Sequence, residues 1–233
     1  MIRKHIPNAI SCLNLVSGCI AIVFAFHGQY SMAASFIALA AVFDFFDGFA
    51  ARLLKAYSPI GKELDSLADV VSFGVAPGIM IFNFIEDLAK STNSSEYLAY
   101  SAFLIPAFSA LRLAKFNLDE RQTASFIGLP TPANALFWAF GISCSFGYLL
   151  DTTLSPVIIV IAVLLSSWLL VSEIPMFSLK FKHYKWVGNR LRYYFLIGCL
   201  LLLVVLKEEG VSACILWYIL LSILSSRPAK KQI

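Results

Sequence analysis

Long apolar runs recur along the whole chain, and they constrain its fold more than any other feature. Each run is close to the roughly 20 residues that a helix needs to cross a bilayer. Of the 233 residues, 59% are hydrophobic and only 14% are charged, whereas a soluble domain carries about 25% charged residues. The sequence therefore predicts an all-α, polytopic membrane bundle of about eight transmembrane helices. The expected spans cover residues 8–27, 32–54, 65–86, 97–116, 131–150, 155–173, 192–206 and 210–225.

The distribution of positive charge indicates how these spans are oriented. If the N-terminus is cytoplasmic and the spans alternate, 16 of the 18 Lys and Arg residues fall on the cytoplasmic side, and only Lys90 and Lys207 fall outside. Cytoplasmic loops of membrane proteins are enriched in Lys and Arg. The pattern predicts cytoplasmic N- and C-termini in an integral protein of a bacterial inner membrane. The net charge of +4 follows from this rule and favours contact with anionic membrane lipids, so we expect no nucleic-acid partner.

Four aspartates interrupt the second and third apolar runs. Asp44 and Asp47 are three residues apart, and Asp65 and Asp69 are four apart. On helices, both spacings place the paired side chains on one face, about 5–6 Å apart. A carboxylate in the hydrocarbon region costs about 2.5–3.5 kcal/mol, and neighbouring anions repel one another unless a cation lies between them. The pattern predicts a divalent metal site, and because all four ligands are oxygens, Mg²⁺ or Mn²⁺ fits better than Zn²⁺.

Small residues and an arginine accompany the aspartates. Gly48 and Ala51 leave room for a ligand to approach the helix backbone, and Gly61 lies in the turn before the third span. Arg52 lies eight residues after Asp44, on the same helix face, and a guanidinium suits a phosphate or diphosphate. These residues together predict a metal-bound diphosphate at the membrane surface. Two alternatives stay open, because intramembrane carboxylates also form proton or cation sites in transporters, and charged pairs can hold helices together in a scaffold.

The string from Asp44 to Asp69 resembles the signature of the CDP-alcohol phosphatidyltransferase family. That signature is D-x-x-D-G-x-x-A-R, eight residues, and G-x-x-x-D-x-x-x-D, and the chain fills every fixed position. The resemblance implies a six-helix membrane core, here with two further helices. It implies that an alcohol displaces CMP from a CDP-linked lipid, with divalent metal, expected as two ions. It also implies a single domain over residues 1–233, with a catalytic core at about 5–173 and C-terminal helices at 174–233.

The resemblance implies a role for each motif residue. Asp44, Asp47 and Asp65 are similar to the family's metal ligands. Asp69 is similar to the general base that takes the proton of the acceptor hydroxyl, and it is also expected to contact the second metal ion. The residues similar to those that hold the CDP moiety are Asn8, Asn14, Gly48, Ala51, Arg52 and Gly61.

Further strings resemble the branch of this family that uses L-serine as its acceptor. They lie at residues 72–77, 112–117 and 126–133. The implied substrates are CDP-diacylglycerol and L-serine, and the implied products are phosphatidylserine and CMP. We expect Arg112 to bind the serine carboxylate, because its planar fork matches that group, with Ser72 and Asn117 near the ammonium group. Membrane anchoring stays open as the role of Arg112, and a backbone carbonyl in residues 128–132 stays open as the partner of the ammonium group. Glycerol 3-phosphate, inositol phosphate and choline stay open as acceptors, and a homodimer stays open as an assembly.

Overall fold

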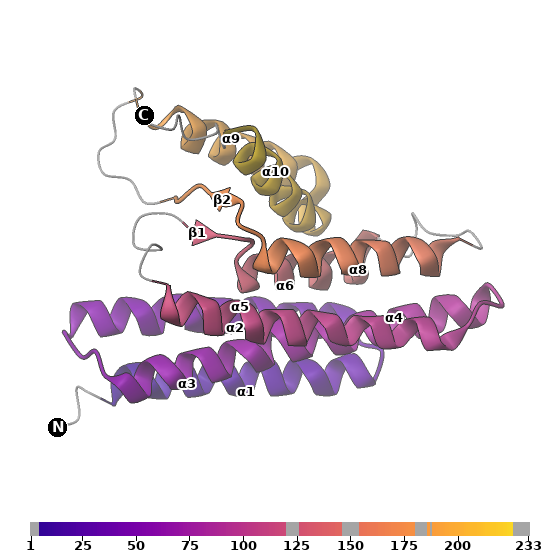
Figure 1. Cartoon of the computed structure of the whole chain (residues 1–233), viewed down its shortest axis with the longest axis horizontal. Coiled ribbons are helices and arrows are strands. Elements are labelled where there is room, and N and C mark those ends of the chain that lie inside the picture. Colours follow the sequence, from indigo (N-terminus) through magenta and orange to yellow (C-terminus); the bar gives the residue numbers. More distant parts are fainter. Residues whose placement is uncertain (1–4, 120–125, 146–153, 180–185, 187, 226–233) are drawn as a thin grey trace, which may run out of the picture.

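The computed structural model describes residues 5–119, 126–145, 154–179, 186 and 188–225 of an almost entirely helical chain (Figure 1). The α-helices are α1 (Ile6–Phe26), α2 (Tyr30–Leu53), α3 (Pro59–Asp69), α4 (Ala76–Ser91), α5 (Leu104–Leu118), α6 (Thr131–Phe140), α8 (Ser155–Val171), α9 (Arg190–Leu206) and α10 (Gly210–Ser225). Two π-helical segments cover Val70–Val75 and Gly141–Ser145, and two 3₁₀ segments cover Glu96–Phe103 and Lys207–Glu209. The strands β1 (Phe126–Ile127) and β2 (Pro175–Met176) form one antiparallel pair.

Four continuous helical stretches are long and apolar enough to cross a membrane. They are Ile6–Phe26, Tyr30–Leu53, Pro59–Ser91 and Glu96–Leu118. Three of them match the expected spans to within two residues at each end, and the third stretch is longer than expected. Helix α8 is a shorter apolar helix. Eight crossings and cytoplasmic termini stay predictions, and residues 1–4, 146–153 and 226–233 lie outside the described part of the chain.

The third stretch begins at Pro59, six residues before the expected span, because its first turns are capped rather than apolar. Ser58 has an extended backbone, and its hydroxyl accepts a hydrogen bond of 3.1 Å from the backbone N–H of Gly61. Pro59 occupies the first turn, where a missing N–H has no cost. The cap lets the helix begin six residues before Asp65, so that Asp65 lies within α3 rather than at its start.

This third stretch is the centre of the bundle. Within its most apolar window 67% of the residues are buried, compared with 28–33% in the other three candidate spans. Helix α1 packs closely against it at Gly18. A Cβ atom built on Gly18 would lie only 2.7 Å from Cα of Ser72, so the two backbones approach in a way that glycine permits.

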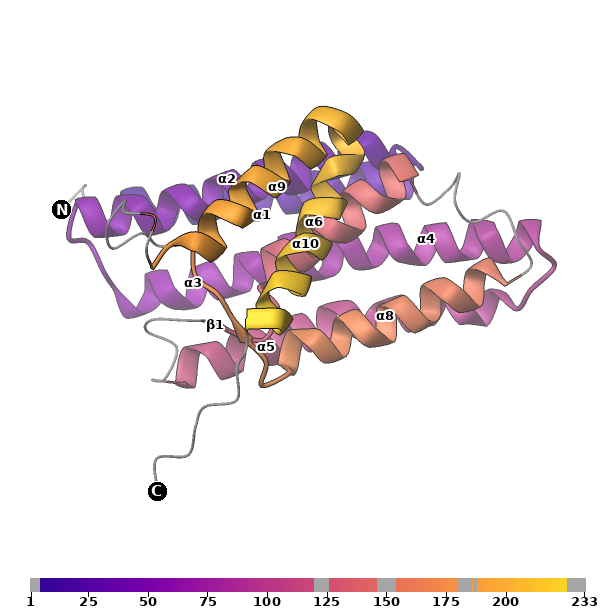
Figure 2. The ribbon, with the colours of Figure 1, turned by 90° about the horizontal axis from the view of Figure 1, so that it is seen from above.

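The C-terminal helices α9 and α10 pair with each other, and α10 packs on α6 (Figures 1 and 2). The start of α6 is fixed against the end of α8 through backbone hydrogen bonds. Gly128, with a positive φ of 75°, donates to the carbonyl of Ile174 at 2.9 Å, and Leu129 donates to that of Leu169 at 2.9 Å. A Cβ on Gly128 would lie 2.6 Å from the carbonyl oxygen of Leu170, so this contact requires glycine.

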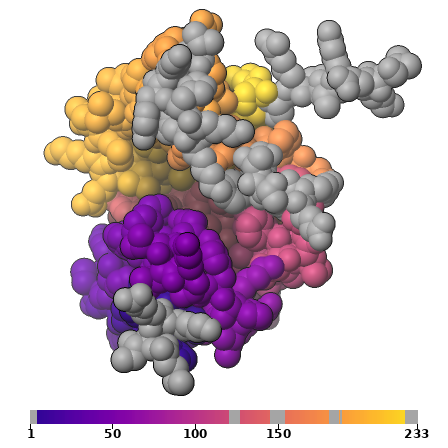
Figure 3. Space-filling view, turned by 90° about the vertical axis from the view of Figure 1, so that its left-hand side faces the viewer, coloured from indigo at the N-terminus to yellow at the C-terminus, as the bar shows by residue number. Residues whose placement is uncertain are grey.

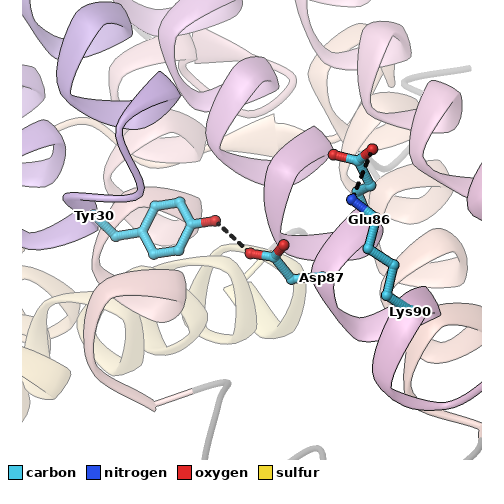
Figure 4. A network of polar contacts seen from close by, with 4 residues as sticks. All are labelled: Tyr30, Glu86, Asp87 and Lys90. Atoms are coloured by element: carbon cyan, nitrogen blue, oxygen red, sulfur yellow. Dashed lines mark hydrogen bonds and ion pairs between the residues drawn. The ribbon is translucent and has the colours of Figure 1, made fainter.

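A polar network holds the ends of α2 and α4 together, at the opposite end of α2 from Asp44 and Asp47 (Figure 4). The Tyr30 hydroxyl donates to Asp87 Oδ2 at 3.2 Å, and Lys90 Nζ lies 3.2 Å from Glu86 Oε1. Tyr30 is roughly 21 Å along the helix from Asp44 at 1.5 Å per residue. Glu86 and Asp87 therefore offer carboxylates for control variants in the same continuous helical stretch as Asp65 and Asp69.

Candidate active site

Three aspartates from two helices meet in the first half of the bundle. Asp44 and Asp47 lie on α2 and Asp65 lies on α3. Each offers a carboxylate oxygen, and these oxygens all lie within 4.8 Å of one another. The spacing within each helix was evident from the sequence, and the fold adds the contact between helices. Three carboxylates this close can share a cation, because the cation offsets their mutual repulsion.

Helix α1 supplies two side chains that hold the aspartates. Ser11 Oγ donates a hydrogen bond of 2.6 Å to Asp47 Oδ2. Asn14 Nδ2 donates one of 3.0 Å to Asp69 Oδ1. Asn14 belonged to the residues expected at the site, whereas Ser11 did not. The signal for Ser11 was its position between Asn8 and Asn14, because polar residues three apart share one helix face.

Asp69 lies apart from the group of three that could share an ion, although it is one turn beyond Asp65 in α3. Only 6% of its surface is exposed. Its described hydrogen bond to Asn14 fixes one carboxylate oxygen. The other oxygen is available to accept a proton or to contact an ion, which is the geometry that a general base requires.

The donor set fits a hard divalent cation. Asp65 Oδ1 and Asn14 Oδ1 are both buried and have no hydrogen-bond partner among the described residues. A buried oxygen without a donor is unfavourable, and a cation would satisfy both its charge and its coordination. All the neighbouring ligand atoms are oxygens, as Mg²⁺ and Mn²⁺ prefer.

A cavity of about 500 Å³ opens beside the aspartates. Asp47 and Asp65 line it, and so does the turn between α2 and α3, which faces the viewer in Figure 3 in purple. Of the residues expected to hold the CDP moiety, the lining includes Asn8, Gly48, Ala51 and Gly61.

Two glycines shape this cavity in different ways. A Cβ on Gly48 would meet only Arg52 Nη1, at 3.8 Å. The guanidinium of Arg52 therefore lies next to Gly48, although Arg52 is not among the residues that line the cavity. A Cβ on Gly61 would lie 2.9 Å from Asn8 Oδ1 and 3.0 Å from Ser58 Oγ. Gly61 therefore lets α1 and α3 approach each other at the cavity wall.

The three residues expected to bind the acceptor lie in different surroundings. Ser72 Oγ donates to the backbone carbonyl of Asn14 at 3.0 Å. Asn117 Nδ2 donates to Ser66 Oγ at 2.8 Å. Arg112 is buried and lines a second cavity, of about 410 Å³, whose lining includes neither Ser72 nor Asn117. Ser72 therefore links the central helical stretch to α1, and Asn117 links α5 to α3. Arg112, in contrast, lines a cavity.

Comparison with known proteins gives a family and several relatives. The model of the family described as CDP-alcohol phosphatidyltransferase matches residues 4–176. A Bacillus subtilis protein named CDP-diacylglycerol–serine O-phosphatidyltransferase is 35% identical over 182 residues, covering 78% of this chain and 92% of the relative. A Methanocaldococcus jannaschii protein of the same name is 31% identical over 220 residues, covering 94% of each chain. One from Mycobacterium leprae is 38% identical over 138 residues, or 56% of this chain and 44% of the relative.

Proposed function

Because this chain belongs to the CDP-alcohol phosphatidyltransferase family, we propose that it transfers the phosphatidyl group of CDP-diacylglycerol to the hydroxyl of L-serine. The products are phosphatidylserine and CMP. The observation that carries the proposal is the cluster of Asp44, Asp47 and Asp65 beside a cavity of about 500 Å³. The names of the relatives that span most of this chain support serine as the acceptor.

The reaction exchanges one phosphorus–oxygen bond for another. The serine hydroxyl oxygen forms a bond to the phosphorus that carries the diacylglycerol group. The bond from that phosphorus to the oxygen of CMP breaks, and CMP leaves with the electron pair. Asp69 takes the proton of the hydroxyl as the new bond forms, and the hydrogen bond from Asn14 holds its carboxylate in place.

Asp44, Asp47 and Asp65 hold divalent metal in this proposal, as Mg²⁺ or Mn²⁺, and Asp69 contacts the second of two ions. When bound, such ions neutralise the diphosphate and stabilise the charge of the departing CMP. Ser11 keeps one oxygen of Asp47 in a fixed direction. A carboxylate held in this way keeps its orientation relative to the other two aspartates.

The cavity beside the aspartates holds the CDP moiety. Gly48 and Gly61 keep its walls free of side chains, and the guanidinium of Arg52 lies next to Gly48. Asn8 and Ala51 contribute to the lining, and Asn14 acts through Asp69. The lipid tails lie in the membrane, and we place the site on the cytoplasmic face of a bacterial inner membrane, in line with the distribution of Lys and Arg.

Arg112 binds the carboxylate of L-serine in this proposal. Its guanidinium is buried beside a cavity, and it interacts electrostatically with Asp69. The proposal places the acceptor hydroxyl between Arg112 and the base. Ser72 and Asn117 support this arrangement indirectly, since each of them bonds to another part of the α1 and α3 framework.

One assay tests the function directly. Purified protein in detergent is incubated with CDP-diacylglycerol, Mg²⁺ or Mn²⁺, and one alcohol at a time, and CMP release is measured. L-serine is expected to give the fastest release. Faster release with glycerol 3-phosphate, inositol phosphate or choline would show that this alcohol, and not serine, is the acceptor. A cation or proton transporter would instead give flux across vesicles without any CDP-lipid.

A further inference from the structure

The second cavity carries side chains of both charges. It lies between the C-terminal turn of α5 and the residues that follow α8, and these helices run side by side (Figure 2). Its lining includes two basic side chains, Arg112 and Lys115, and two acidic ones, Asp119 and Glu173. Among the residues that the structure describes, none lines both this cavity and the one beside the aspartates. The molecule therefore has two separate cavities near its carboxylate cluster.

Arg112 is the innermost charged group of the second cavity. Only 7% of its surface is exposed. Its Nη1 donates to Thr131 Oγ1 at the long distance of 3.5 Å, and its buried Nε has no hydrogen-bond partner within the described part of the chain. A buried guanidinium with unused donors is unfavourable. An anionic group of a ligand that enters the cavity would satisfy these donors, and a planar carboxylate matches their geometry.

We propose that the second cavity selects a zwitterionic acceptor, with Arg112 and Lys115 drawing in its carboxylate and Asp119 and Glu173 its ammonium group. The inference rests on the proposed transfer to L-serine and adds the site that distinguishes this acceptor from others. The two carboxylates disfavour a phosphorylated alcohol, and the two basic groups disfavour choline. Specificity of this kind depends on repulsion of the wrong ligand as much as on attraction of the right one.

The two cavities also separate the substrates in space. CDP-diacylglycerol approaches from the side of α1, α2 and α3, and the acceptor approaches from the side of α5 and α8. Arg112, the most buried charged group of the second cavity, attracts the Asp69 carboxylate, which suits an acceptor that passes from Arg112 to the base. In a phosphoryl transfer the attacking and leaving oxygens are roughly in line, and entry from two sides favours that arrangement.

The test compares carboxylates that line the cavity with one that does not. Glu173→Gln and the double variant Asp119→Asn/Glu173→Gln each remove acidic charge from the lining. Glu63→Gln is the matched control, because Glu63 is an exposed carboxylate of α3 that lines neither cavity. For each protein we measure KM for L-serine, KM for CDP-diacylglycerol and the inhibition constant of L-alanine. L-alanine carries the charges of serine without its hydroxyl, so it reports binding without reaction.

Glu173→Gln should raise KM for serine and the inhibition constant of alanine by about two- to fivefold, as expected for a solvent-accessible charge pair. The double variant should raise both by about tenfold or more. KM for CDP-diacylglycerol should stay within twofold of its normal value. Glu173→Lys should weaken serine further and improve the use of glycerol 3-phosphate, because it replaces a repelling charge with an attracting one.

Two results would overturn parts of this scheme separately. If unmodified protein uses serine normally and the cavity variants behave like Glu63→Gln, the selection site is wrong and the proposed function stands. If unmodified protein releases CMP with another alcohol but not with serine, the proposed function is wrong, and the second cavity does not bind serine as an acceptor. Glu173 is exposed, so its single variants are expected to fold, which thermal unfolding in detergent checks.

Discussion

Ser11 on α1 donates a hydrogen bond of 2.6 Å to Asp47 on α2, although the two residues are 36 positions apart. The bond joins the first helix to the carboxylate cluster and so limits the orientations that the Asp47 carboxylate can take beside Asp44 and Asp65. Loss of a residue that orients a metal ligand typically weakens metal binding by about 10–100-fold. This relationship gives the first of five predictions.

Ser11→Ala should weaken the apparent affinity for Mg²⁺ or Mn²⁺ by about 10–100-fold, because Asp47 loses the donor that orients it. Activity at saturating metal should recover more than activity at low metal. The measurement is CMP release across a metal titration. Ser35→Ala is the control, since the Ser35 hydroxyl bonds to a backbone carbonyl within α2. Equal metal curves for both variants would separate Ser11 from the metal site.

Metal removal should stop the reaction, because the repelling carboxylates of Asp44, Asp47 and Asp65 need a cation to hold a diphosphate. EDTA is expected to abolish CMP release, and added Mg²⁺ or Mn²⁺ should restore it. Asp44→Asn and Asp65→Asn should each remove most activity while the protein still inserts in the membrane. Full turnover in metal-free buffer would disprove metal catalysis.

Asp69→Asn should lower kcat by about 10²–10⁴, the usual size of general-base catalysis. KM for CDP-diacylglycerol should change much less. Asp87→Asn provides the control, because Asp87 lies in the same continuous helix and bonds to Tyr30 at the other end. A near-normal kcat for Asp69→Asn would mean that another group accepts the proton. Arg52→Ala, in contrast, should mainly raise KM for CDP-diacylglycerol.

Gly18→Ala should destabilise the fold by about 1–3 kcal/mol, the usual cost of overpacking, because its Cβ would lie 2.7 Å from Cα of Ser72. Gly48→Ala provides the contrast. Its Cβ would contact only Arg52 Nη1 at 3.8 Å, and alanine is favoured over glycine within a helix by about 0.5–1 kcal/mol. The melting temperature should therefore stay the same or rise slightly, while KM for CDP-diacylglycerol rises. If the two variants unfold alike, the close approach of α1 to the central helix is not a source of stability.

Arg112→Lys should raise KM for L-serine several-fold and leave KM for CDP-diacylglycerol little changed. Lysine keeps the positive charge but loses the planar fork that matches a carboxylate. Both constants are obtained from initial rates of CMP release. Similar rises in the two constants would assign Arg112 to phosphate binding or to packing beside Thr131.

The sequence predicted features that depend on local periodicity. Hydropathy located the helical stretches, because a helix that faces lipid must be apolar over its whole length. The spacing of Asp44 with Asp47 and of Asp65 with Asp69 placed the carboxylates on helix faces. The early start of α3 was missed, because a cap at Ser58 rather than hydrophobicity sets it.

Contacts between distant segments were beyond this reasoning. The bond from Ser11 to Asp47 depends on how α1 packs against α2. The separation of Arg112 from Asn117 depends on which neighbours each side chain finds, since Asn117 turns to Ser66 and Arg112 to Thr131. The two residues are only five positions apart in one helix and belong to the same short string, so the sequence alone could not show that they have different neighbours.

The π-helical segment Val70–Val75 separates the carboxylates of α3 from the buried residues of α4. One extra residue in a helix rotates everything beyond it by about 100° relative to an uninterrupted α-helix. Asp65 and Asp69 can therefore face the reaction while Met80 and Ile81 face the interior. Over evolution, the length of this segment should therefore be kept. A change of length by one residue would keep both halves helical and yet turn the acids away from their substrates.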